Sequence, residues 1–223
     1  MVLARPAAGG GRWVEISPER MRGWLDGFYG RHDGAMERGL VLTGVSNGDT
    51  ATLYPPPGLA ATDVDALLKA LVRPPRIALL LVRKRAIAVG VADGTTLTAS
   101  KVDRCYVQGR TAAGGSSQHR FARRRENQAD AATRKAAQIA ERVLLPYVHV
   151  SSATGVRAEP ERWLTALVCG GDRLMIDEVL ADRRLRPLAE LRHPTLLESA
   201  EPRLVVLQDA VVRARRVRIH LVP

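Results

Sequence analysis

The chain has 223 residues, 46% hydrophobic and 26% charged, a balance that excludes an intrinsically disordered protein. Lys and Arg number 34 against 23 Asp and Glu, which gives a net charge of +11. Only four basic residues are lysines, so arginine carries almost all of the positive charge. Guanidinium groups match phosphate geometry and stack on bases, and the charge excess therefore favours a nucleic acid or an anionic surface as the partner.

Other classes are disfavoured by simple features of the chain. The longest apolar run, residues 77–82, is far shorter than a membrane span. Cys105 and Cys169 stand far apart, and neither has a neighbouring Cys or His at ligand spacing. We therefore expect a cytoplasmic protein without a membrane anchor, structural disulfides, a metal site or a cofactor.

The N-terminal third predicts a tail followed by a small α/β unit. Residues 1–12 end in three glycines and have no periodicity, which indicates a loose tail. Residues 13–73 should then form the unit, with helices starting at Ser17-Pro18 and at Asp63, and with strands at 41–43 and 50–54. The apolar positions of the first helix, Trp24 among them, are assigned to a core; Trp13 and Trp163 are assigned to core positions in the same way.

Residues 74–223 predict a second, larger α+β domain. Gly and Pro are missing from residues 117–145, so this stretch predicts one long helix. Its later turns carry an apolar stripe that should pack on a core, while the first turns should project. The other elements expected are strands at 76–83, 85–92, 95–100, 104–110, 163–168, 188–191 and 217–222, and helices at 172–181 and 204–213.

The start of the long helix is unusually basic. Arg120, Arg123, Arg124 and Arg125 fall in its first turns, where cations face the positive end of the helix dipole. Stability alone would not select this arrangement. A polyanion would, because the free amides of a helix start and the guanidinium groups all favour phosphate.

The segment Gly114-Gly115-Ser116-Ser117-Gln118 precedes these arginines. Adjacent glycines allow main-chain N–H groups to approach a ligand closely. Glutamine cannot act as a general base because its amide does not titrate, but it can orient a water molecule. Gly114, Gly115, Ser116 and Gln118 are therefore the candidate catalytic residues.

A glycine pair and a glutamine in a loop, opening onto an arginine-rich helix after a set of strands, resembles the catalytic domain of eukaryotic and archaeal class I release factors. It is still more similar to the Vms-type peptidyl-tRNA hydrolases, of which this chain would be a bacterial member. The resemblance covers roughly residues 76–223, and Gly115, Ser116 and Gln118 are the matching positions. Release factors have the glutamine directly after two glycines, whereas Ser116 and Ser117 intervene here.

The resemblance implies a mixed sheet of ribonuclease-H-like type and hydrolysis of the peptidyl-tRNA ester, which frees nascent chains from stalled large ribosomal subunits. Gln118 would position the water. The implied partners are ribosomal RNA of the large subunit and peptidyl-tRNA, and the free protein would be a monomer. The RNA contacts would come from the arginines and their neighbours: Arg110, Ser117, His119, Arg120, Arg123, Arg124 and Arg125. No stop-codon-reading domain is evident in the sequence, which favours stand-alone rescue over codon-dependent termination.

The same residues suggest three alternative functions. A serine hydrolase using Ser116 or Ser117 with His119 lacks a third group to orient the base, and helix capping is a sufficient reason for the serines. A metal-dependent nuclease would need carboxylates on its strands, and residues 76–83 and 85–92 contain none. A non-catalytic module that binds rRNA or tRNA through the same helix stays open.

Overall fold

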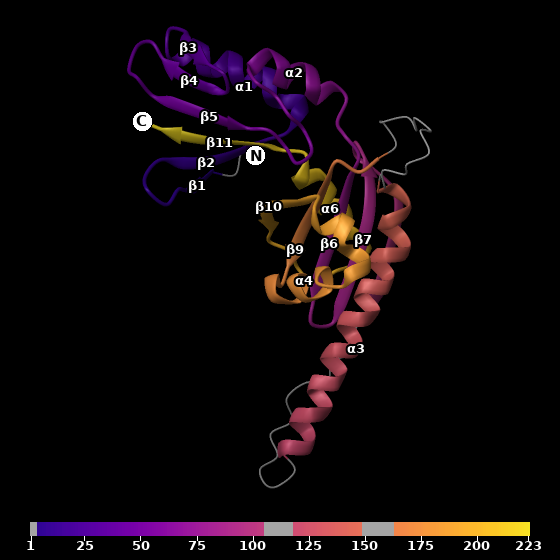
Figure 1. The fold of residues 1–223 in the computed structure, drawn as a ribbon. Helices are drawn as coiled ribbons and strands as arrows, with labels where there is room; N and C mark the ends of the chain where they lie inside the picture. The colour runs from indigo at the N-terminus through magenta and orange to yellow at the C-terminus, as the bar shows by residue number, and fades with distance from the viewer. Residues whose placement is uncertain (1–3, 105–117, 149–162) are drawn as a thin grey trace. The chain divides into compact units, whose positions relative to one another are not determined.

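The computed structural model describes residues 4–104, 118–148 and 163–223, and for residues 118–130 it describes the backbone only. The chain divides into two compact units (Figure 1). Unit 1 contains the residues up to Pro75 together with Val212–Pro223, and unit 2 contains Arg76–Val211. Each unit has its own sheet and its own buried core, so the mixed α+β class is confirmed.

Unit 1 is an antiparallel sheet with two helices on one face. The strand order is β1-β2-β11-β5-β4-β3. Figure 1 shows α1 and α2 on the same side of this sheet. The strands are β1 (Ala4–Pro6), β2 (Arg12–Ile16), β3 (Ala35–Arg38), β4 (Val41–Gly44), β5 (Thr50–Tyr54) and β11 (Val217–Val222), and the helices are α1 (Pro18–Arg31) and α2 (Val64–Val72).

Alternating burial along the strands explains how the unit 1 core forms. Val14 and Ile16 of β2 are buried, as are Val217 and Ile219 of β11, while the residues between them lie on the other face. Apolar side chains from both helices complete the cluster: Met21, Leu25 and Phe28 of α1, and Val64, Leu67 and Leu71 of α2.

Two expectations for the chain ends need correction. Residues 4–6 and 12 belong to strands rather than to a loose tail, because β1 pairs with β2 and β2 pairs with β11. The last strand, β11, is hydrogen-bonded between β2 and β5 of unit 1, although its position in the sequence had assigned it to the second domain. Pairing between strands some 200 residues apart leaves no local signal in the sequence.

Unit 2 contains a mixed sheet in the order β10-β9-β6-β7-β8. Strands β6, β7 and β8 are antiparallel neighbours, whereas β9 runs parallel to β6 and β10 runs parallel to β9. The strands are β6 (Ile77–Arg83), β7 (Ala86–Asp93), β8 (Thr96–Arg104), β9 (Ala166–Gly171) and β10 (Arg192–Leu197). The helical elements are α3 (Gln118–Leu144), η1 (Leu145–Tyr147), α4 (Arg173–Leu180), η3 (Arg183–Leu185), α5 (Arg186–Ala189) and α6 (Leu204–Ala214), the last of which crosses the boundary between the units.

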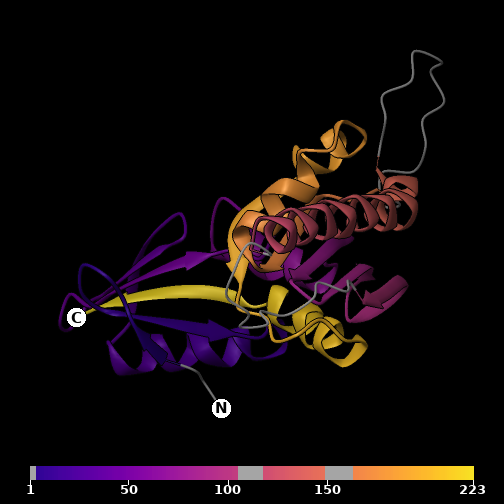
Figure 2. The ribbon, with the colours of Figure 1, turned by 90° about the horizontal axis from the view of Figure 1, so that it is seen from below.

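Helices cover both faces of the unit 2 sheet, as Figure 2 shows with α3 and α6 on opposite sides. The central strands β6 and β7 are consequently buried at every position except their last residues. Gly90 of β7 provides room for α6, since a Cβ atom there would lie 3.1 Å from a methyl carbon of Leu207. This two-sided burial explains the continuous apolar runs in the sequence.

The turn from β9 into α4 is a tight connection. Gly171 has φ of +104°, and a Cβ atom there would lie 2.2 Å from the carbonyl oxygen of Val82, so only glycine fits. Asp172 then caps α4 by accepting a hydrogen bond from the backbone N–H of Met175. The predicted start of this helix is confirmed.

The prediction of a strand at residues 188–191 is wrong. Leu188 and Ala189 end the short helix α5, and the strand β10 begins only at Arg192. Leu188 is fully buried in the unit 2 core. A short apolar run does not by itself distinguish a buried helix from a buried strand.

Candidate functional site

The candidate site is built around the start of α3. The segment that connects β8 to this helix, residues 105–117, lies outside the described residues. The roles predicted for Arg110, Gly114, Gly115, Ser116 and Ser117 therefore concern residues that the structure does not describe. Gln118 is the first residue of α3, and His119, Arg120, Arg123, Arg124 and Arg125 follow in its first turns. These residues share one stretch of helical backbone, and the roles of their side chains stay predictions.

The second half of α3 fixes the helix to unit 2. Buried alanines at 132, 136, 137 and 140 let the helix lie close to the sheet, where Val89 and Val91 of β7 belong to the same core cluster. Ile139 and Leu144 add larger buried side chains. The prediction that the later turns of α3 pack on a core is therefore confirmed.

Polar contacts tie the same half of α3 to three neighbouring elements. Lys135 contacts Asp103 of β8, with 3.0 Å between Nζ and Oδ1, and its ammonium also donates to the carbonyl oxygen of Arg104 at 3.3 Å. Thr133 donates to Glu178 of α4 at 3.3 Å. The guanidinium of Arg184 in η3 joins Glu141 of α3 to Asp182. These contacts restrain rotation and sliding of the helix on the sheet.

The contact between Lys135 and Asp103 joins the end of β8 to the packed half of α3. Asp103 stands next to Arg104, the last residue of β8, while Lys135 belongs to the helix that follows the segment. The hydrogen bond from Lys135 lowers the pKa of the Asp103 carboxyl, and it outweighs the opposing effect of desolvation. This contact thus fixes β8 to α3, the helix that follows the connecting segment.

We expect Lys135→Ala to lower the free energy of unfolding by about 0.5–1 kcal/mol at neutral pH, the range for a partly exposed ion pair. The folded-state pKa of Asp103 is below its unfolded value, so the stabilisation is complete above the unfolded pKa and disappears as the pH falls through the folded pKa. Urea unfolding at neutral and acid pH measures this difference. A double-mutant cycle with Asp103→Asn isolates the pair, and a coupling that persisted in acid would contradict the assignment.

The first half of α3 reaches away from these anchors. Gln118 precedes Lys135 by 17 residues. At the rise of an α-helix this separation is about 25 Å along the axis. Figure 1 shows the first turns of α3 continuing past the turn between β6 and β7. The helix thus holds Gln118 well away from the packed part of unit 2.

The charges at this end favour an anionic ligand. No acidic residue occupies the first turn of α3, while four arginines follow Gln118 within seven residues. The unpaired N–H groups and the dipole of a helix start add partial positive charge at the same end. The arrangement can hold phosphate groups next to Gln118.

The described residues lack two features that are typical of other function classes. In that part of the chain no group of three or more His, Cys, Asp or Glu side chains is placed to hold a metal ion. None of its helices combines the length and the apolar character that crossing a membrane requires.

Sequence reasoning missed a second feature, which lies in unit 1. The described part of α1 borders a hollow lined by Arg20, Trp24 and Arg31 among others. Trp24 had been assigned to the core by its helical spacing, and it does pack against the core, yet it stays partly exposed. The signal that could have revealed it was the spacing of Arg20, Trp24 and Arg31 on one side of a helix.

Similar solved structures are distant. The archaeal translation termination factor aRF1 shares 19% identity at a TM-score of 0.46, and the alignment covers 91% of this chain and 63% of that chain. A structure described as an archaeal protein shares 13% identity at a TM-score of 0.34, with 91% and 65% covered. The chain therefore spans less than two thirds of the length of either. No match was found among curated proteins.

A family model gives a more specific result. The model described as acVLRF1, the Actinobacteria/chloroflexi VLRF1 release factor, matches residues 75–220. The matched range contains all of α3, the strands of the unit 2 sheet and every site residue that the sequence predicts around the start of α3. Because the match extends over more than half of the chain, the protein belongs to the Actinobacteria/chloroflexi VLRF1 release factor family.

Proposed function

We propose that this protein hydrolyses the ester bond of peptidyl-tRNA on the large ribosomal subunit and thereby frees nascent chains from stalled subunits. Its membership of a release-factor family suggests a role in translation termination or ribosome rescue. The observation that carries the finer proposal is the position of Gln118 at the first residue of a helix whose other half is anchored in the core. Such a helix can carry the residues at its start to a site that a compact domain could not enter.

The proposed chemistry needs no acid–base pair in the protein. Gln118 would hold a water molecule against the ester carbonyl carbon, accepting a hydrogen bond through its amide oxygen or donating one through its NH₂ group. Backbone N–H groups of the Gly114-Gly115-Ser116 segment would stabilise the developing oxyanion. The ribosome and the 2′-hydroxyl of the tRNA would supply the remaining catalysis.

The arginines of the first turns would bind the surrounding RNA. Arg120, Arg123, Arg124 and Arg125 would contact phosphates of rRNA or of the tRNA acceptor end, and Arg110, Ser117 and His119 would add contacts beside them. The sheet order β10-β9-β6-β7-β8, antiparallel on one side of β6 and parallel on the other, supports the proposal of a ribonuclease-H-like catalytic domain. We place the protein in the cytoplasm as a monomer that joins the ribosome.

The direct test combines purified protein with large subunits that carry peptidyl-tRNA and follows the released peptide on a gel. We expect release with the wild-type protein and only background release without it. The competing function is a non-catalytic module that binds rRNA or tRNA. The feature that supports it is the arginine-rich helix. Cosedimentation with the subunit in the absence of release would support that module and reject the hydrolase.

A further inference from the structure

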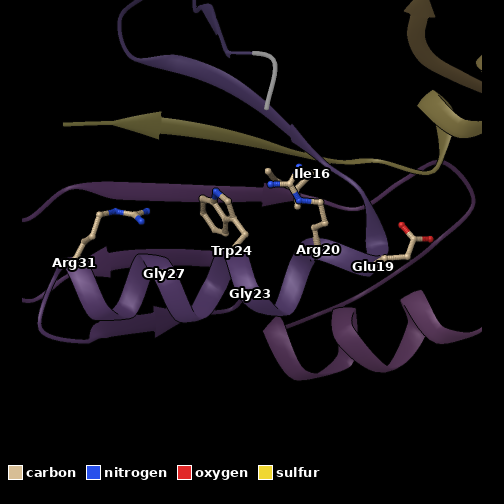
Figure 3. A pocket seen from close by; sticks show the side chains of 7 residues that line it. All are labelled: Ile16, Glu19, Arg20, Gly23, Trp24, Gly27 and Arg31. Atoms are coloured by element: carbon tan, nitrogen blue, oxygen red, sulfur yellow. The ribbon is translucent and has the colours of Figure 1, made fainter. Parts of the chain in front are cut away.

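Unit 1 has a hollow of about 390 Å³ beside α1, lined by Ile16, Glu19, Arg20, Gly23, Trp24, Gly27 and Arg31. Its volume falls within the range of small-ligand sites, about 300–1,000 Å³. In Figure 3 the side chains of Arg20, Trp24 and Arg31 point to the same side of α1, and Trp24 lies between the two arginines. The hollow thus presents one aromatic ring flanked by two cations.

Helix geometry explains why these three side chains share a face. Positions 20, 24 and 31 differ by four and seven residues, which places them within about 40° of each other around a helix with 3.6 residues per turn. Gly23 and Gly27 lie next to them, and a Cβ atom at Gly23 would meet nothing within 4 Å. At Gly27 a Cβ atom would lie 3.2 Å from Nη1 of Arg31, so this glycine leaves room for the guanidinium, while Gly23 leaves open space beside the helix.

The two arginines are available for a ligand. Both are exposed, and among the residues that the structure describes neither has an acidic partner. Glu19, the carboxylate at the edge of the hollow, is paired with Arg215, with 3.1 Å between Oε1 and Nη2. Its charge is therefore compensated from within unit 1, and the hollow keeps a positive balance.

Trp24 is held with its ring partly accessible. Its indole stacks on Phe28 of the core, with 5.6 Å between ring centroids and 22° between the ring planes. The contact with Phe28 fixes the orientation of the Trp24 ring, and part of that ring stays exposed to solvent. A rigid, supported ring is a suitable platform for a nucleobase, since bases stack on aromatic side chains regardless of sequence.

We propose that this hollow binds single-stranded RNA, with a base stacked on Trp24 and the neighbouring phosphates held by Arg20 and Arg31. The arginines are 11 positions apart. That is about 16 Å along the helix, which accommodates more than one nucleotide of a strand. Cations on both sides of the ring can face phosphates of the strand while a base that branches from its sugar faces the ring. The choice of RNA over DNA rests on the release-factor family, but the site is independent of the chemistry proposed for Gln118.

Trp24 provides a direct readout because the chain has only three tryptophans. In the full-length variant Trp13→Phe/Trp163→Phe, Trp24 is the sole source of indole fluorescence. We expect a short oligouridylate to quench this fluorescence in a saturable manner. Arg123→Ala/Arg124→Ala removes RNA contacts proposed for α3, so quenching that persists when this change is added reports binding at the hollow. The anisotropy of a labelled oligouridylate shows at which RNA concentration the protein is saturated. Absence of Trp24 quenching at that concentration would overturn the proposal.

Single arginine variants in the same background test the phosphate contacts. We expect Arg20→Ala and Arg31→Ala each to weaken the RNA binding measured by quenching about 5-fold at 0.1 M salt. Each change should also make the plot of log affinity against log salt concentration shallower by about 0.7. Arg22→Ala is the matched control, since Arg22 is exposed on the opposite side of α1. An equal loss with Arg22→Ala would overturn the site, because it would indicate general charge attraction.

Two further measurements decide the nature of the occupant. Trp24→Phe retains a ring and should bind a labelled oligouridylate within a few-fold of the Arg123→Ala/Arg124→Ala parent, whereas Trp24→Leu should bind about 5- to 100-fold more weakly. Equal binding by both would overturn stacking. Polyglutamate that quenches Trp24 and displaces the RNA would overturn RNA as the occupant in favour of an acidic peptide. The peptide-release assay does not enter these tests, so failure here leaves the proposed hydrolysis unaffected.

Discussion

Gln118→Ala is expected to slow peptide release from large subunits carrying peptidyl-tRNA by about 100-fold, the cost of losing one positioned hydrogen-bonding group at a reacting centre. Alanine preserves the helix and removes only the amide that would hold the water. Binding to the subunit should stay at the wild-type level, because the arginines are intact. Single-turnover release at saturating protein measures the chemical step apart from binding.

The control for this change is Gln138→Ala. Gln138 is an exposed glutamine of the same helix on its packed half, about 30 Å along the axis from Gln118. Release by Gln138→Ala should match the wild type. If Gln118→Ala also released peptide at the wild-type rate, Gln118 would have no catalytic role and the RNA-binding module would be the better description.

Arg123→Ala/Arg124→Ala is expected to weaken association with large subunits about 40-fold near 0.1 M salt. Each phosphate contact contributes a slope of about 0.7–0.9 in a log–log plot of affinity against salt, so the loss of two should make that plot shallower by about 1.6. The weakening should shrink as salt is raised. Cosedimentation across a salt series measures both the affinity and the slope.

Arg134→Ala/Arg142→Ala provides a matched charge change on the same helix. Both arginines are exposed, and both lie on the half of α3 that is anchored to unit 2. We expect this variant to change affinity far less than the first pair does. Equal losses for the two pairs would mean that net charge, rather than the start of α3, governs association.

Much of the local structure was predictable because its causes are local. Asp63 and Asp172 each accept a hydrogen bond from a backbone N–H three residues later, so the helix starts could be read from residue type. The long helix followed from a stretch without Gly or Pro, and the buried strands from apolar runs. The strand β3 was missed because its four residues are mostly exposed and show no apolar pattern.

For the candidate site too, some features could be predicted from the sequence and others could not. The residue types of the Gly114–Gln118 segment and the arginines that follow were evident in the sequence, since their chemistry does not depend on distant partners. The fastening of β8 to α3 by Lys135 and Asp103 was not, because 32 residues separate the two. The face formed by Arg20, Trp24 and Arg31 was also overlooked, since helical spacing alone assigns Trp24 to the core.

The sequence by itself determined most of the elements, the basic charge and the residues at the start of α3, because helix propensity, capping and burial patterns act over a few neighbouring residues. Only the tertiary structure decided that β11 completes the sheet of unit 1, that alanines seat the second half of α3 on the unit 2 sheet, and that Trp24 keeps part of its ring in solvent. Strand pairing and close packing join residues far apart in the chain, and a one-dimensional pattern does not record which of them meet.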